Sequence, residues 1–150
     1  NIFMGKELKY PFGFIRDKEQ ITEANRLIRE IGFTSKLINA ESPVGNLSGG
    51  ERQGVAIARA IYNNAELIIL DEPTNNLSLN ETQKVFDFVL NVKKSNRSVL
   101  FIGHNIYHVY DISDRFVILD RGEVVHHLDK ENIQSPEELM KIMRDTIKSH

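Results

Sequence analysis

The chain of 150 residues contains no cysteine. It can therefore form neither disulfides nor thiolate metal sites, which agrees with a reducing compartment. It also has no run of eighteen or more apolar residues, and it does not begin with a charged and then apolar segment typical of a secretory signal. We therefore expect a cytosolic location.

A strong charge of one sign is also absent. The formal net charge is -2, and acidic and basic residues are interspersed along the chain. This composition offers no basic stripe for nucleic acid and no basic run for a membrane surface. We expect no nucleic-acid partner, so partners have to be inferred from individual sites.

Apolar residues make up 41% of the chain, which is enough for a buried core. Residues 1–46 combine one amphipathic helix, expected at 17–31 with Gly32 as its cap, with turns at proline and glycine. We interpret this part as a small helical subdomain. Because the first residue is Asn1 and the sequence begins as if inside a domain, we expect a piece of a longer protein.

From residue 47 onward, strands and helices alternate, which predicts an α/β fold with a mostly parallel sheet over 47–150. Two apolar runs are typical of buried parallel strands, and two Ser-x-x-Glu capping boxes, at Ser78 and Ser135, predict helix starts. The expected helices are 49–63, one after Ser78, 106–112 and one from 135 to about 147; the expected strands are 67–70, 98–103, 116–119 and 123–126, the last two joined by a tight turn at Asp120.

The string Leu-Ser-Gly-Gly-Glu-Arg-Gln occupies residues 47–53. A hydroxyl and two glycines at a helix start suit a phosphate, because the free N–H groups and the positive end of the helix dipole point to it and the glycines let the backbone approach. The alternative is that Ser48 only caps the helix and the glycines only form a turn. The complete string is rarer than its parts and favours phosphate binding.

Two carboxylates, Asp71 and Glu72, follow the apolar run at 67–70. The end of a parallel strand is where such sheets bind ligands, so Asp71 is a candidate Mg²⁺ ligand. Glu72 is a candidate base for a water that attacks a γ-phosphate. The alternative is a strand that ends in two solvated acids, but the position some twenty residues after the phosphate-type turn favours catalysis.

His104 follows the second apolar run and is expected at the same sheet edge as Asp71. An imidazole there can bind a γ-phosphate and position water together with Glu72, although an ordinary histidine at a helix start is the alternative. No role is assigned to the other histidines, which have no metal-ligand spacing: His108, His126, His127 and His150.

A Gly-x-x-x-x-Gly-Lys-Ser/Thr phosphate loop does not occur in the chain. The pair Gly5-Lys6 is followed by Glu7 instead of Ser or Thr and lacks the upstream glycine, so it does not match. The motifs therefore describe part of a nucleotide hydrolase without its phosphate loop.

In the order of its motifs the chain resembles the ATP-binding cassette ATPases. Residues 47–53 are similar to the family's signature, residues 67–72 to its Walker B strand and His104 to its switch histidine. The D-loop corresponds to Asn75, Asn76, Leu77 and Ser78. The resemblance implies a partial P-loop NTPase fold, with 1–46 as the helical subdomain and 47–150 as the catalytic core without its Walker A part.

The resemblance also implies two half-sites in a head-to-tail dimer with a second nucleotide-binding domain. The signature would contact ATP held by the other subunit, through Leu47, Ser48, Gly49, Gly50, Glu51 and Gln53. Asp71 with Mg²⁺, Glu72 and His104 would serve ATP in their own subunit.

Residues 1–7 and 75–78 resemble the monosaccharide-import branch, in which Ser78 replaces the more common aspartate. This implies an ATPase subunit that powers import of a small solute, a sugar, at the cytoplasmic face of the membrane. Its further partners would be transmembrane permease subunits, docked on the helical subdomain, and indirectly a substrate-binding protein.

Two other functions remain open. A soluble cassette ATPase acting on nucleic acid or ribosomes would need basic surface or coiled-coil arms, which the sequence does not indicate. A non-catalytic interaction module is the other alternative, and the presence of Glu72 and His104 speaks against it for the whole protein.

The chain of 150 residues should not bind ATP tightly or hydrolyse it, because it lacks the lysine and the backbone cradle for the β- and γ-phosphates. We expect isothermal titration calorimetry with Mg²⁺ and ATP to detect no submillimolar affinity. Clear binding in that range would contradict this prediction.

Overall fold

The computed structural model describes residues 1–31, 39–75 and 77–149. Within it the chain forms two compact units. The first contains residues 1–69 and 73–100, and the second contains residues 70–72 and 101–150. The predicted cap at Gly32 and the D-loop residue Asn76 lie outside the described residues. Within the described ranges, no helix combines the length and apolar character that crossing a bilayer requires.

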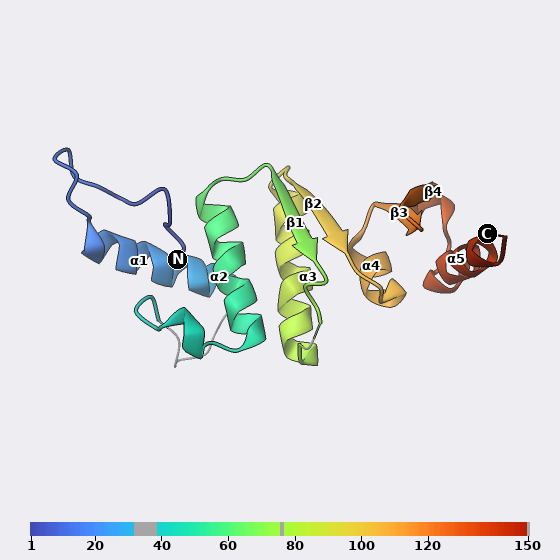
Figure 1. Ribbon diagram of the computed structural model, residues 1–150, viewed down its shortest axis with the longest axis horizontal. Coiled ribbons are helices and arrows are strands. Elements are labelled where there is room, and N and C mark those ends of the chain that lie inside the picture. The colour runs from blue at the N-terminus through green and yellow to red at the C-terminus, as the bar shows by residue number, and fades with distance from the viewer. Residues whose placement is uncertain (32–38, 76, 150) are drawn as a thin grey trace. The chain divides into compact units, whose positions relative to one another are not determined.

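The first unit is built on two packed helices, α1 (Asp17–Glu30) and α2 (Gly49–Tyr62) (Figure 1). A short 3-10 helix, η1 (Val44–Asn46), precedes α2. Leu27 of α1 and Ala58 of α2 are completely buried, because the apolar residues of each helix recur at helical spacing and face the core. The expected helices at 17–31 and 49–63 are therefore present, each one residue shorter at its end.

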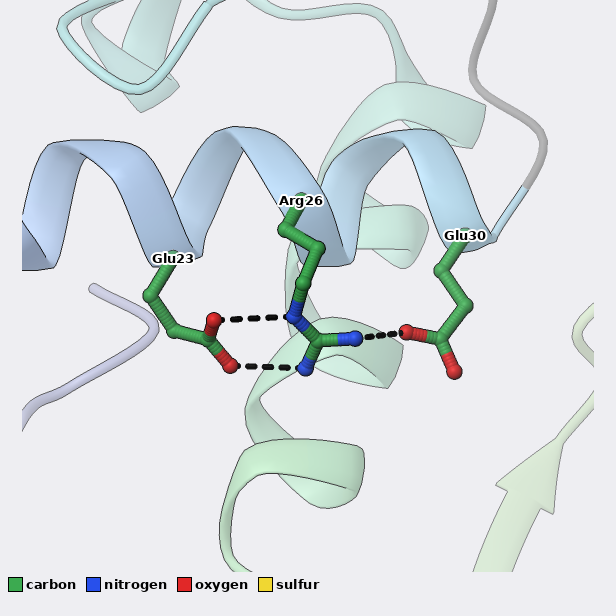
Figure 2. Close-up of polar contacts among 3 residues, drawn as sticks. All are labelled: Glu23, Arg26 and Glu30. Atoms are coloured by element: carbon green, nitrogen blue, oxygen red, sulfur yellow. Dashed lines mark hydrogen bonds and ion pairs between the residues drawn. The ribbon is translucent and has the colours of Figure 1, made fainter.

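The exposed face of α1 carries a local ion network, shown in Figure 2. The Arg26 guanidinium donates to both carboxylate oxygens of Glu23, at 2.8 and 2.7 Å, and to Glu30 at 2.5 Å. These hydrogen bonds hold the pKa of Glu23 below its usual range and raise the pKa of Arg26. Because all three side chains are solvated, the network supports the helix only weakly.

Helix α3 (Leu79–Lys94) completes the helices of the first unit, and it begins at the predicted capping box. The Ser78 hydroxyl accepts from the Glu81 N–H at 3.4 Å, and the Ser78 N–H donates to the Glu81 carboxylate at 2.9 Å. Val85, Phe88 and other apolar residues at helical spacing are buried. The start of this helix was thus predicted correctly from Ser-x-x-Glu.

Strands β1 (Leu67–Asp71) and β2 (Ser98–Ile102) pair in a two-stranded sheet. Ser98 N–H donates to Glu66 C=O at 2.9 Å and Glu72 N–H donates to Ile102 C=O at 2.9 Å, so the strands start and end together and run parallel. Both strands were expected to be buried, but neither is buried along its whole length.

The burial of β1 alternates instead: Ile68 and Leu70 are buried, whereas Leu67 and Ile69 are 54% and 60% exposed. In β2, Leu100 and Ile102 are similarly half exposed. Alternating side chains point to opposite faces of a strand, so one face of the pair packs and the other presents apolar side chains to solvent.

The second unit contains α4 (Ile106–Ile112), β3 (Arg115–Asp120), β4 (Glu123–Asp129), the 3-10 helix η2 (Lys130–Asn132) and α5 (Pro136–Ser149). Strands β3 and β4 form an antiparallel hairpin whose turn places Arg121 and Gly122 at φ +47° and +87°. The predicted hairpin is therefore confirmed, as a sheet of its own. In the second unit, a core cluster is formed by Phe116, Ile133 and Leu139.

The capping box at α3 should make a pH-dependent contribution to stability. The Ser78 N–H, followed by the Ser78 hydroxyl, holds the pKa of Glu81 below its ordinary value of 4.5. Because the folded pKa is the lower one, this contribution is complete above pH 4.5 and is lost as the pH falls through the folded value. Urea unfolding of wild type and Glu81→Gln should differ at neutral pH, by under about 1 kcal/mol, and the difference should disappear once the pH lies below the folded pKa of Glu81.

Glu66→Gln, an exposed change of the same charge outside the box, is the control for net charge. A difference between wild type and Glu81→Gln that stays constant over the whole pH range would contradict the assignment.

Candidate functional site

Glu72 and His104 come together in the second unit. Glu72 directly follows β1, and His104 lies two residues after β2, so the parallel pairing brings both to one sheet edge. His104 Nδ1 lies 3.2 Å from Glu72 Oε1, and the two side chains are 72% and 45% exposed. The pair is accessible from solvent, as a site for a phosphate and a water requires.

The backbone of Glu72 has an unusual conformation, with φ at +46°. This left-handed region is uncommon for residues other than glycine, and a residue before proline normally prefers extended backbone. Glu72 precedes Pro73, so sequence reasoning gave no signal for it. Strained backbone of this kind concentrates at functional sites, and here it directs a carboxylate towards His104.

The position of His104 is set on both sides by its neighbours in the chain. A Cβ on Gly103 would lie 3.0 Å from the Phe101 ring and 3.4 Å from Val109 Cγ2, so the glycine lets α4 approach the end of β2. On the other side, the Asn105 side chain accepts from the His108 N–H at 3.4 Å and caps α4. His104 is therefore held between a tight strand end and a capped helix.

Asp71, the candidate metal ligand, is the last residue of β1 and is exposed. Across the described residues, no group of three or more His, Asp or Glu side chains is arranged to hold a metal ion. A Mg²⁺ ion that travels with a nucleotide needs only one or two carboxylates, because phosphate oxygens and waters complete its shell. The exposed Asp71 carboxylate therefore suits a Mg²⁺ ion that arrives together with a nucleotide.

The signature turn lies in the first unit, at the start of α2. Ser48 caps the helix: its hydroxyl accepts from the Glu51 N–H at 3.3 Å, and its N–H donates to the Glu51 carboxylate at 2.7 Å. Ser-Gly-Gly-Glu is thus a full capping box, a Ser-x-x-Glu signal that sequence reasoning overlooked. Ser48 and Gly49 are exposed while Leu47 is buried. The serine hydroxyl accepts within the box, and a hydroxyl can also donate its hydrogen to an acceptor.

Gly50 has a structural reason to be glycine. It is buried, and a Cβ there would lie 2.8 Å from Glu81 Oε1 and 3.0 Å from Leu77 Cδ2. The sequence predicts a ligand-binding role for both glycines, and the structure adds a steric reason for the second at the start of α3. The signature helix and the end of the D-loop segment therefore touch within one unit. Of the remaining expected site residues, Asn75 is exposed and Glu51 and Gln53 are partly buried.

The sequence and the fold have counterparts in known proteins. Residues 3–75 match the model of the ABC transporter family. The chain is 40% identical over 143 residues to a xylose/arabinose import ATP-binding protein, XylG, of Sulfolobus acidocaldarius, and 34% identical over 143 residues to a ribose import ATP-binding protein, RbsA 2, of Escherichia coli O157:H7. Both alignments cover 95% of this chain. The chain therefore belongs to the ATP-binding cassette family, and both of these relatives are sugar-import ATP-binding proteins.

Solved structures agree with this assignment. A metal-chelate type ABC transporter in an inward-facing conformation matches 91% of the chain with a TM-score of 0.69 and 26% identity. A dimeric ATP-binding cassette in a post-hydrolysis state, bound to ADP and Pi, matches 85% with the same TM-score and identity. The predicted α/β fold of an ABC cassette is thus confirmed.

The match covers only part of each known protein. The chain spans 55% of the XylG relative and 27% of the RbsA relative, and 53% of each of these two structures.

The two signature glycines should respond differently to alanine. Gly50→Ala places a Cβ against Glu81 and Leu77 and disturbs the capping box of α3, whereas nothing lies within 4 Å of the corresponding Cβ at Gly49. We expect chemical denaturation to show Gly50→Ala about 1 kcal/mol less stable than Gly49→Ala, which should be neutral or slightly stabilising. Equal stability of the two variants would show that Gly50 has no such steric role.

Proposed function

We propose that this chain is part of an ATP-hydrolysing subunit that powers import of a monosaccharide. The observation that carries the proposal is the contact of His104 with Glu72 at the end of an apolar parallel strand, 3.2 Å apart and open to solvent. The sugar-import relatives support the substrate class, since their names specify xylose, arabinose and ribose.

In this proposal the second unit performs the chemistry. Glu72 orients and deprotonates the water that attacks the γ-phosphate, and His104 bonds the γ-phosphate while its Nδ1 faces Glu72. Asp71 holds Mg²⁺, which neutralises charge on the phosphates when it is bound. The left-handed backbone of Glu72 keeps the carboxylate at this place before substrate arrives.

The first unit would serve the nucleotide of a neighbouring subunit. Ser48 and Gly49 are exposed at the N-terminus of α2, where the helix dipole and the first N–H groups favour an anion. We assign to the same signature site Leu47, Gly50, Glu51 and Gln53. We assign the D-loop role to Asn75, Asn76, Leu77 and Ser78. The partner is a second nucleotide-binding domain in head-to-tail arrangement.

The exposed apolar face of β1 and β2 supports a larger cassette around this chain, because open apolar strand faces call for further packing elements. We propose residues 1–46 as the helical subdomain that docks permease subunits and residues 47–150 as the catalytic core. The subunit would act peripherally at the cytoplasmic face of the membrane, with a substrate-binding protein as an indirect partner. Tight ATP binding would come from a Walker A segment of the whole protein.

Glu72→Gln in the whole subunit should lower kcat at least about 100-fold, because the glutamine cannot accept the proton of the attacking water. ATP binding should remain, so ATP-dependent dimers should persist or accumulate in size-exclusion chromatography. The measurement is phosphate release under saturating Mg²⁺ and ATP.

Glu131→Gln, an exposed change of the same charge in η2, is the matched control and should leave turnover unchanged. Undiminished hydrolysis by Glu72→Gln would remove Glu72 as the base, and a wild-type subunit without ATPase activity would contradict the proposed function itself.

A further inference from the structure

Helix α4 follows His104 almost immediately but is only seven residues long, Ile106–Ile112. Helices of this length are unstable on their own, since nucleation costs more than a few hydrogen bonds return. The position of His104 therefore depends on what holds α4. Its N-terminus is capped by Asn105, and its side packs on Gly103 through Val109.

The C-terminus of α4 is held by a side chain from a distant part of the second unit. Lys130, at the start of η2, donates from its Nζ to the carbonyl oxygens of Tyr110 at 2.6 Å and Asp111 at 3.3 Å. These are carbonyls of the last turn, which have no partner inside a helix and attract a cation. Both bonds go to main-chain oxygens of α4, so the ammonium holds the backbone of the last turn rather than one side chain.

Tyr110 strengthens the same connection. The Lys130 ammonium lies 4.7 Å from the centroid of the Tyr110 ring, and that ring is stacked parallel to Phe116 of β3 at 5.9 Å. The Tyr110 hydroxyl donates to the Ile133 carbonyl at 2.9 Å. Because Phe116 and Ile133 belong to the core of the second unit, the end of α4 is tied to a packed core as well as to Lys130.

We infer that Lys130 is a positioning residue for His104: it fixes α4 by its C-terminal carbonyls and thereby fixes the imidazole against Glu72. The inference rests on the proposed function for its catalytic consequence, but its structural part does not. The Lys130 ammonium contacts the end of α4, so its effect on His104 passes through α4 and the Gly103–Val109 contact. Without the ammonium, the last turn of α4 loses these hydrogen bonds, and the His104 imidazole is no longer fixed against Glu72.

The first test is steady-state ATPase kinetics of the whole subunit. Lys130→Met keeps the aliphatic stem and removes the ammonium, and we expect kcat to fall about 10- to 100-fold while the KM for ATP stays unchanged. Lys130→Arg retains charge and donors and should restore most of kcat. Lys141→Met, an exposed lysine of α5, is the matched control and should behave as wild type.

A double-variant cycle separates positioning from general structural support. In a His104→Ala background, Lys130→Met should cause no further loss of kcat, because the residue through which it acts is already gone. Three results would each overturn the inference. They are a double variant whose loss of kcat is the product of the two single losses, a raised KM in Lys130→Met, and a Lys130→Arg variant that does not restore kcat. If Lys130→Met does not fold, Lys130→Gln takes its place. It should show a smaller loss of kcat, an unchanged KM and no further loss in the His104→Ala background.

Hydrogen–deuterium exchange of the whole subunit tests the structural part without any ATPase activity. Peptides that cover 104–113 should exchange faster in Lys130→Met than in wild type, while peptides of α3 should not change. Unchanged exchange at 104–113 would overturn the role of Lys130 even in an active enzyme. A subunit that is inactive but shows the expected exchange would contradict the proposed function and leave this connection standing.

Discussion

The contact between Glu72 and His104 depends on the parallel pairing of two short strands, and the account of function depends on that contact. The hydrogen bond from the Glu72 N–H to the Ile102 carbonyl, at 2.9 Å, brings the ends of β1 and β2 to the same level. The two side chains that follow these strands then meet at 3.2 Å. The cost is a left-handed backbone at Glu72, which the strand pairing has to hold in place. A carboxylate and an imidazole that are placed before substrate arrives need little reorganisation in the reaction.

In the signature turn, the serine that we propose as a phosphate contact also has a structural role. Ser48 caps α2 through a reciprocal box with Glu51 and remains exposed to an incoming phosphate. Gly50, next to it in the helix, lies so close to the start of α3 that a Cβ there would require the Glu81 and Leu77 side chains to shift. The first turn of α2 therefore packs closely on the start of α3.

Much of the fold and the composition of the site could be predicted from the sequence, because they follow local rules. Apolar spacing and a Ser-x-x-Glu box located α3, and the turn after Asp120 located the hairpin. The residues at strand ends could be anticipated because parallel strands expose ligand sites there. Features that depend on contacts between distant segments could not be predicted: the fit of Gly50 against Glu81, the hold of Lys130 on α4, and the solvent exposure of one face of β1. The positive φ of Glu72 could not be predicted either, because residues before proline prefer extended backbone.

In the proposed function, this chain contributes to two different nucleotide sites, one through each unit. The most direct measurement is an experimental structure of the whole subunit with Glu72→Gln, Mg²⁺ and ATP. The account predicts a dimer in which His104 lies within hydrogen-bond distance of the γ-phosphate in its own subunit, while Ser48 contacts the γ-phosphate held by the neighbour. A nucleotide that approaches neither residue, or a Ser48 that faces its own subunit away from any phosphate, would contradict it.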